Sequence, residues 1–267
     1  QADILLCRAD RPIPEDARKK IALFCNVAPE RVISAPDVNT IYEVPLIYHA
    51  QNFDVEVCKH FGIESEVEPN LELWKEIVAR VNKPEDEVTV AVVGKYIELP
   101  DAYKSLAEAL SHGGIANNVS VKLLWLDAEI FESENAVHRL ADVDGILVPG
   151  GFGERGAEGK VAAVRFARQH EVPFFGICFG MQMAVIEVSR SLAGLNLAGS
   201  TEFGSVSDPV VGLLTEWKRG DYIEHRDQNV DLGGTMRLGA YPCSLTKGTL
   251  AHQIYGSEMV EERHRHR

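Results

Sequence analysis

The sequence lacks the features of several large classes of protein. No apolar run reaches the ~18 residues that a membrane-spanning helix needs, and no signal-peptide pattern is present. Positive charge is also scarce, because 27 Lys and Arg face 40 Asp and Glu, giving a net charge of −13. A general nucleic-acid binder needs a basic surface instead. We therefore expect neither membrane nor nucleic acid as a partner.

Cysteine is sparse and unpatterned. The chain has five cysteines and no C-x-x-C pair. A disulfide framework or a structural zinc site requires cysteines at recognisable spacings, so we predict neither, and we predict no metal site in this chain. The scattered set fits a reducing compartment, and we expect a cytoplasmic protein. The five are Cys7, Cys25, Cys58, Cys178 and Cys243.

Short apolar runs alternate with amphipathic helical stretches from residue 88 onward. This alternation favours an α/β fold with an open, mostly parallel sheet flanked by helices. The expected strands are 88–94, 119–126, 144–148 and 174–177, and the expected helices are 101–112, 136–140, 162–169 and 181–192. The first of these helices is expected to end at the pair Gly113-Gly114. The last has apolar residues at helical spacing, namely Met181, Val185, Val188 and Leu192.

Two regions precede this sheet. Residues 1–62 also alternate, with strands expected at 4–7, 21–25 and 31–33 and helices at 15–20 and 40–50, the latter broken by Pro45. Residues 63–87 are acidic and polar and enclose one amphipathic helix, 71–81, which we interpret as a linker with a docking helix. The predicted domains are therefore 1–62, 63–87 and 88–267. Because a core strand starts almost at Gln1, we expect an internal piece of a longer polypeptide.

Cys178 lies in the motif Gly176-Ile177-Cys178-Phe179-Gly180, between an expected strand and an expected helix. A strained strand-to-helix turn that exposes a nucleophile needs glycine on both sides. The turn also places the sulfur at a helix N-terminus, which stabilises negative charge. These residues alone leave two interpretations open: a nucleophile, or an inert cysteine buried in the core.

A glycine-rich loop, residues 149–156, follows the expected strand 144–148. Three interpretations fit this loop: a phosphate cradle, although it lacks the Lys-Ser/Thr ending of a P-loop; a donor of N–H groups to an oxyanion; or an ordinary flexible loop. Sites in parallel sheets lie at the carboxyl ends of the strands. Two glycine loops at neighbouring strand ends, one bearing a cysteine, favour acyl transfer, with the Phe179 amide as one donor.

Longer motifs carry a resemblance to a known family. The two glycine motifs resemble those of class I, or triad, glutamine amidotransferases. Segments 94–105, 200–203, 231–239 and 262–267 are similar to CTP synthases and not to other amidotransferases. Segments 20–27 and 36–42 resemble the end of the CTP synthase synthetase domain. The resemblance implies a class I glutamine amidotransferase fold preceded by the end of an α/β nucleotide-binding synthetase domain.

The resemblance also implies an activity. CTP synthases use ATP, with Mg²⁺, to phosphorylate the 4-oxygen of UTP, and ammonia from L-glutamine then displaces phosphate to give CTP. The expected partners are L-glutamine, UTP and ATP, with CTP as feedback inhibitor, GTP as activator and a homotetrameric assembly. ATP and Mg²⁺ serve the full-length enzyme as co-substrate and metal, and no prosthetic group is expected.

Site residues follow from the matched motifs. The resemblance assigns Cys178 as the nucleophile that forms a glutamyl thioester. It assigns Glu202 and Arg267 to the α-amino and α-carboxylate groups of glutamine, as charge complementarity requires. The remaining glutamine-pocket residues are Gly151, Phe179, Gly180, Met181 and Gln182, with Phe179 standing where leucine is commoner. The nucleotide residues are Lys20 for UTP or CTP, and Pro36, Asp37 and Val38 beside the ATP adenine.

The family's histidine base and its carboxylate partner are expected beyond Arg267. The arginines around His264 and His266 disfavour the protonated state through which a base must pass, so we interpret both as structural or pocket-edge residues. We expect the chain by itself to hydrolyse glutamine no faster than background. Two alternatives stay open: another class I glutamine amidotransferase, such as GMP synthase or anthranilate synthase, or a non-catalytic, filament-forming relative.

Overall fold

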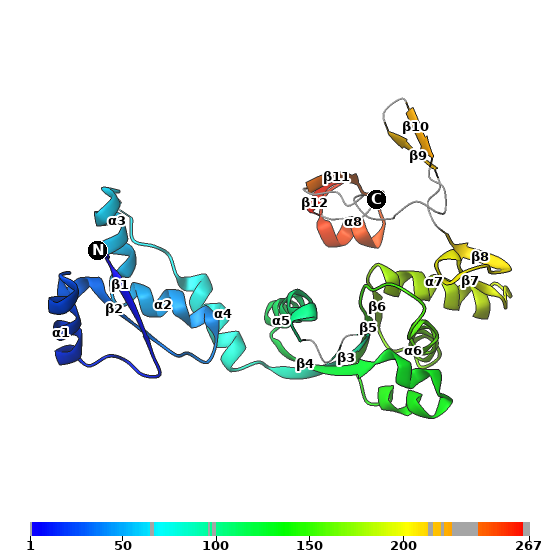
Figure 1. Ribbon diagram of the computed structural model, residues 1–267, viewed down its shortest axis with the longest axis horizontal. Coiled ribbons are helices and arrows are strands. Elements are labelled where there is room, and N and C mark those ends of the chain that lie inside the picture. The colour runs from blue at the N-terminus through cyan, green and yellow to red at the C-terminus, as the bar shows by residue number, and fades with distance from the viewer. Residues whose placement is uncertain are drawn as a thin grey trace. The chain divides into compact units, whose positions relative to one another are not determined.

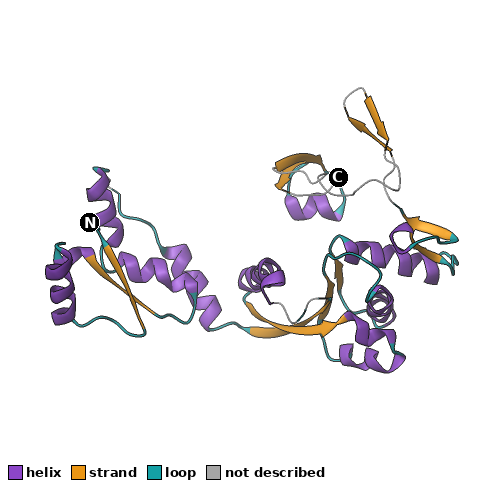
Figure 2. Cartoon of the chain, in the orientation of Figure 1, coloured by secondary structure: helices purple, strands orange, loops and turns teal. Residues whose placement is uncertain are grey.

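The computed structural model describes residues 2–64, 67–95, 97, 100–212, 216–219, 222–225 and 240–263. The chain forms two compact units, residues 1–211 and 212–267, whose helices and strands are drawn in Figure 1 and Figure 2. The division into 1–62, 63–87 and 88–267 stays a prediction. No helix in the described ranges is long and apolar enough to cross a membrane.

A four-stranded parallel sheet organises the first unit, with the strand order β4-β3-β5-β6. All four strands occur where the alternation predicts them: β3 (Asp86–Gly94), β4 (Val119–Asp127), β5 (Gly145–Val148) and β6 (Phe174–Gly176). The register pairs Val148 with Gly176. The chain therefore leaves β5 and β6 at the same edge of the sheet, which brings the two glycine motifs together.

Three helices connect and cover these strands: α5 (Lys104–Asn117), α6 (Ala157–Gln169) and α7 (Phe179–Ser191). Short 3-10 helices occur at Pro100–Tyr103, Ala128–Glu132, Glu134–Leu140 and Thr201–Phe203. Two further strands, β7 (Ala198–Ser200) and β8 (Asp208–Val211), pair in parallel. Apolar side chains from β3, β5 and α6 form the main core, including Ala91, Val148 and Phe166. The α/β prediction is confirmed.

The predicted end of one helix is wrong. The helix α5 continues through Gly113 and Gly114 and ends at Asn117, and its C-cap residue, Asn118, has a left-handed φ of 57°. A Cβ on Gly114 would lie 2.6 Å from the carbonyl oxygen of Val119. This glycine therefore serves the close approach of helix and strand and does not terminate the helix.

The expected helix 181–192 is confirmed as α7, and the structure adds which of its faces is buried. The expected apolar stripe is exposed, and the buried face consists of Phe179, Met183 and Ile186, which pack against α6. Helical spacing alone fits either face. The start of the helix at Phe179, directly after the turn, decides which face is buried. The exposed residues are Met181, Val185, Val188 and Leu192, at 41–65% exposure.

The amino-terminal part contains two parallel strands, β1 (Leu5–Ala9) and β2 (Val32–Pro36). Its helices are α1 (Glu15–Cys25), α2 (Val44–His49), α3 (Phe53–Phe61) and α4 (Glu72–Asn82), with 3-10 turns at Pro29–Arg31 and Ile41–Glu43. The expected strand 21–25 is wrong, because these residues form the second half of α1. Ala22 is buried while Leu23 and Phe24 are exposed, the pattern of one turn of a surface helix.

Pro45 does not break its helix, because it lies in the first turn of α2, where a missing N–H costs nothing. The expected helix at 71–81 is confirmed as α4.

The second unit contains two antiparallel pairs. Strand β9 (Glu216–Arg219) pairs with β10 (Tyr222–His225), and β11 (Ala240–Ser244) pairs with β12 (Met259–Arg263). The helix α8 (Leu250–Tyr255) lies between the last two strands in sequence. Thr249 caps it by accepting a hydrogen bond from the His252 amide at 3.3 Å.

Candidate functional site

Cys178 sits in a strained turn between β6 and α7. Its backbone has φ 53° and ψ −105°, a conformation that a residue with a side chain rarely adopts. Such strain persists only where the surrounding structure enforces it, and it gathers at functional positions. Cys178 is the N-cap of α7, so its sulfur lies at the positive end of the helix.

The two flanking glycines are sterically required. A Cβ on Gly176 would lie 2.6 Å from the carbonyl carbon of Gly180, and a Cβ on Gly180 would lie 2.0 Å from the carbonyl oxygen of Val148. The turn is further held by the amide of Ile177, which donates to the Val148 oxygen at 2.9 Å. Backbone contacts between β5 and the start of α7 thus fix the position of the cysteine.

The glycine-rich loop after β5 lies beside the cysteine. A Cβ on Gly150 would be 3.6 Å from the Cβ of Cys178. The sequence prediction named Gly151 for the oxyanion pocket, and it did not name the neighbouring Gly150, whose backbone lies beside Cys178. The adjacent ends of β5 and β6 explain this contact, and the sequence pattern alone does not report strand order.

The loop is anchored to a carboxylate. The amide of Gly153 donates to Oε1 of Glu202 at 2.7 Å, and Gly153 has a left-handed φ of 77°. The backbone amide of Glu202 in turn donates to the Ser200 hydroxyl at 3.2 Å. Glu202 is exposed. Two parts that the sequence placed in one pocket, the loop and Glu202, are therefore joined directly.

Two lysines meet the same loop, and the sequence analysis named neither. Lys95 Nζ donates to the carbonyl oxygen of Phe152 at 3.1 Å. Lys160, on α6, is 1% exposed, and its Nζ lies 4.6 Å from the centroid of the Phe179 ring. A Cβ on Gly151 would lie 3.5 Å from this Nζ. The sequence signal that could have identified Lys160 is its position three residues after Ala157, which places it on the apolar, buried face of α6.

The pKa of Lys160 is lowered to about 8, chiefly by burial and also by the charge of Lys95, while Asp127 acts in the opposite direction. The site therefore combines a cysteine at a helix N-terminus with a close backbone loop and a buried cation. These features favour nucleophilic attack on an acyl carbon, because negative charge develops first on sulfur and then on oxygen.

The other predicted residues are placed as follows. Gly180 is buried in the turn, and Met181 is 55% exposed. The backbone amide of Gln182 donates a hydrogen bond to the carbonyl oxygen of Cys178 at 3.1 Å, in the first turn of α7. Arg267 lies outside the described residues, as do His264 and His266. The predicted roles of these residues, and of Gly151, Phe179 and Glu202, stay predictions.

The predicted nucleotide residues lie in the amino-terminal part. Lys20 is on the exposed face of α1, and Pro36 ends β2. Asp37 bonds Arg8 at 3.0 Å through an exposed ion pair. Val38 follows Asp37 in the loop after β2. Their proposed contacts with nucleotides stay predictions. The described residues hold no cluster of three or more His, Cys, Asp or Glu placed to bind a metal ion.

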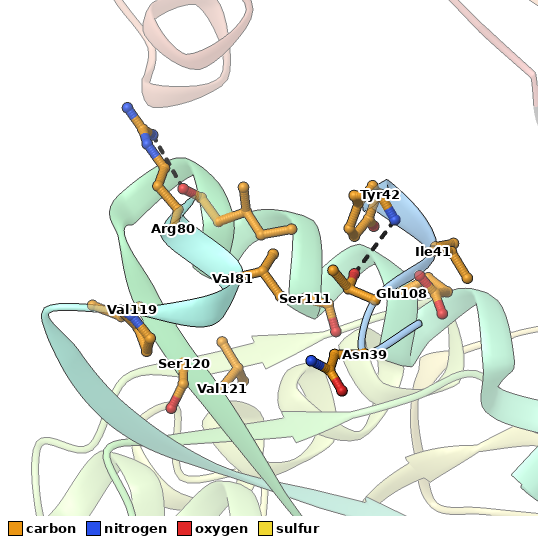
Figure 3. Close-up of a pocket in the computed structure, with 13 residues that line it drawn as sticks. Asn39, Ile41, Tyr42, Arg80, Val81, Glu108, Ser111, Val119, Ser120 and Val121 are labelled. Atoms are coloured by element: carbon orange, nitrogen blue, oxygen red, sulfur yellow. Dashed lines mark hydrogen bonds between the residues drawn. The ribbon is translucent and has the colours of Figure 1, made fainter. Parts of the chain in front are cut away.

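A pocket of about 380 Å³ lies away from the cysteine, between the segment 39–42, α4, α5 and β4 (Figure 3). Arg80 donates to the carbonyl oxygen of Ile115 at 3.1 Å, and the Tyr42 hydroxyl bonds His112 Nε2 at 2.8 Å. None of the predicted site residues lines this pocket. It marks instead where α4 joins the amino-terminal part to α5.

Two family models match the chain. Residues 98–267 match "Glutamine amidotransferase class-I", and residues 1–63 match "CTP synthase N-terminus". Curated relatives agree over the whole chain. It is 64% identical to a CTP synthase of Rhodospirillum centenum, of which it covers 49%, and 63% identical to one of Azospirillum brasilense, of which it covers 50%. The chain thus spans about half the length of these relatives.

A solved structure is also similar: "Trypanosoma brucei CTPS - glutaminase domain with bound acivicin". The identity is 38%, the TM-score is 0.57, and the match covers 67% of each chain. The resemblance to CTP synthases inferred from the motifs is confirmed. With a family model matching residues 98–267 and a cysteine turn of the required geometry, the chain belongs to the class I glutamine amidotransferases.

Proposed function

We propose that this protein is a glutamine-hydrolysing CTP synthase, in which Cys178 releases the ammonia that aminates UTP. The observation that carries the proposal is the strained turn that places Cys178 at the N-terminus of α7 beside the Gly150 backbone. The similarity to CTP synthases over the whole chain, 64% to that of Rhodospirillum centenum, supports the choice among amidotransferases.

The chemistry starts at the thiolate. Sγ of Cys178 attacks the side-chain amide carbon of glutamine, a C–S bond forms, and the C–N bond breaks as ammonia leaves with a proton from a general acid. Water then hydrolyses the thioester to glutamate and regenerates the thiol. The amides of Gly151 and Phe179 stabilise the oxyanion, and Phe179 is suited because first-turn amides have no partner within their helix.

The substrate ends are held by charge. Glu202 binds the α-amino group of glutamine, and Arg267 binds the α-carboxylate. The hydrogen bond from Gly153 to Glu202 supports this role, because it fixes the carboxylate beside the loop at 2.7 Å. Met181 and Gln182 complete the pocket.

The second half-reaction uses nucleotides. ATP, with Mg²⁺, phosphorylates the 4-oxygen of UTP, and ammonia displaces phosphate to give CTP, ADP and phosphate. Lys20 binds UTP or CTP, and Pro36, Asp37 and Val38 border the ATP adenine. CTP inhibits by feedback, GTP activates, and the enzyme is a cytoplasmic homotetramer.

The decisive experiment labels the cysteine. Acivicin, the compound in the solved relative's title, should alkylate Cys178, as located by peptide mass spectrometry, and L-glutamine should protect it. Cys25→Ala and Cys243→Ala are matched controls that keep full labelling, because both cysteines are exposed and outside the turn. Labelling spread evenly over all cysteines, or unaffected by glutamine, would exclude a glutamine pocket at Cys178.

A second measurement identifies the product. With UTP and ATP, Cys178→Ala should abolish glutamine-dependent CTP formation and spare ammonia-dependent formation, since free ammonia bypasses the thioester. Equal loss of both would mean a folding defect. Formation of GMP from its precursor, and not CTP, would favour the alternative amidotransferase.

A further inference from the structure

Lys160 is a buried cation at the catalytic edge of the sheet. Its side chain is 1% exposed, although it belongs to the first turns of α6. Lysine is among the residues least often fully buried, because its ammonium loses hydration. Such a position needs a compensating interaction or a function.

The surroundings of Lys160 are those of the proposed oxyanion pocket. Its Nζ lies over the ring of Phe179 at 4.6 Å, and a Cβ on Gly151 would be 3.5 Å from it. Phe179 follows Cys178 directly at the start of α7, and Gly151 follows Gly150 in the loop that lies beside Cys178. The structure records no salt bridge to Lys160 from any described carboxylate, and Asp127 acts on it only at longer range.

We propose that Lys160 is a positioning residue of the glutaminase site, which holds Gly151 and Phe179 in place and stabilises negative charge at Cys178 and on the oxyanion. This rests on the proposed function. The cation–π contact fixes the first residue of α7, whose amide is the proposed donor. The buried charge acts through a low local dielectric, where its field at the reacting atoms is large.

The experiment compares four variants of the full protein. Lys160→Met removes the charge at nearly constant volume, Lys160→Gln keeps a polar tip in case methionine unfolds the helix pair, and Lys160→Arg restores the cation. Lys122→Met is the matched control, because Lys122 is an exposed lysine on β4. Circular dichroism selects the variants that fold.

Two readouts are measured at pH 7. The kcat for glutamine hydrolysis should fall about 10-fold to 100-fold in Lys160→Met or Lys160→Gln, less than the loss of a direct oxyanion donor, while KM stays within about twofold. Iodoacetamide alkylation of Cys178, followed by mass spectrometry, should slow about threefold to tenfold. Lys160→Arg should recover most of both rates, and Lys122→Met should match the unmodified protein.

The outcomes separate two failures. Unchanged alkylation in a folded charge-removing variant, or a loss of thermal stability with kcat intact, overturns the role of Lys160. A full-length protein without substitutions that is alkylated normally yet hydrolyses no glutamine overturns the proposed function. In that case the alkylation comparison still decides whether Lys160 acts on Cys178.

Discussion

The two ends of the α6–α7 helix pair each contain a buried charge, but only one of these charges is paired with an opposite charge among the described residues. At the N-terminal ends, Lys160 of α6 meets Phe179 of α7. Eight residues further along each helix, Arg168 of α6 meets Glu187 of α7 in a bidentate ion pair of 2.9 and 3.1 Å. Equal offsets are what two parallel helices produce when both follow strands of a parallel sheet.

The difference lies in how each charge is compensated. Glu187 is fully buried and accepts hydrogen bonds from Arg168 and from the Ser191 hydroxyl at 2.6 Å. Burial alone would raise the pKa of Glu187, but these bonds and the nearby Arg165 charge lower it below its usual value. Lys160 lies instead against the ring of Phe179 and the backbone of the glycine-rich loop. The Arg168–Glu187 pair therefore joins the two helices through compensated charge, whereas no carboxylate among the described residues pairs with Lys160.

The largest expected effect is at the structural end. Glu187→Ala should lower the free energy of unfolding by roughly 3 kcal/mol, because it breaks a buried pair and leaves a cavity. Urea denaturation measures this. Alkylation of Cys178 in the folded variant should be unchanged.

The control for this variant is Glu158→Ala. Glu158 also pairs with an arginine, Arg190 at 2.7 Å, but it is 63% exposed. An exposed pair contributes only about 0–1 kcal/mol. Equal destabilisation by both substitutions would contradict the distinction between the two pairs.

A smaller loss of stability is expected at the end that carries Cys178, from the substitution Gly180→Ala. The added methyl would meet the Val148 oxygen at 2.0 Å, so the turn must shift. Overpacking of this kind costs about 1–3 kcal/mol, and labelling of Cys178 by acivicin should be lost with it. Thermal unfolding and peptide mapping test both effects.

Gly113→Ala serves as its matched glycine control. Gly113 lies inside α5, and the space that an added methyl group would occupy is open. Alanine there should raise stability by about 0.5–1 kcal/mol, since glycine loses more conformational entropy in a helix. If Gly180→Ala behaved the same way, the steric account of the turn would be wrong.

The smallest effect is a dependence of stability on pH. Glu187 has a lowered pKa in the folded protein, so its stabilisation is present above the ordinary glutamate value of 4.5 and is lost as the pH falls through the folded value. Glu56, bonded by Lys59 at 2.7 Å and by Arg31, changes in the same direction. Unfolding followed between pH 3 and 7, roughly the range of carboxylate titration, should show a shallower slope in Glu187→Gln. If stability depended on pH equally steeply in Glu187→Gln and in the unmodified protein, Glu187 would not contribute to the loss of stability in acid.

Much of the site was predictable from local pattern. The strand, the glycine pair and the cysteine at 174–180 lie next to each other in sequence, and a strand-to-helix turn has few backbone solutions. The central strands were predicted for a similar reason, because residues such as Val90 and Ile146 lie in short apolar runs within the alternation. The helical face of α7 and the second half of α1 were not, since a short apolar run fits more than one structure.

The sequence by itself determined the fold class, the cysteine turn and the family, because each rests on residues close together in the chain. Only the tertiary structure decided which residues that are distant in the sequence come into contact. The neighbouring ends of β5 and β6 place Gly150 beside Cys178, and packing of α6 on α7 buries Lys160 against Phe179. Strand order and helix packing are long-range outcomes of burying a shared core, and local spacing does not encode them.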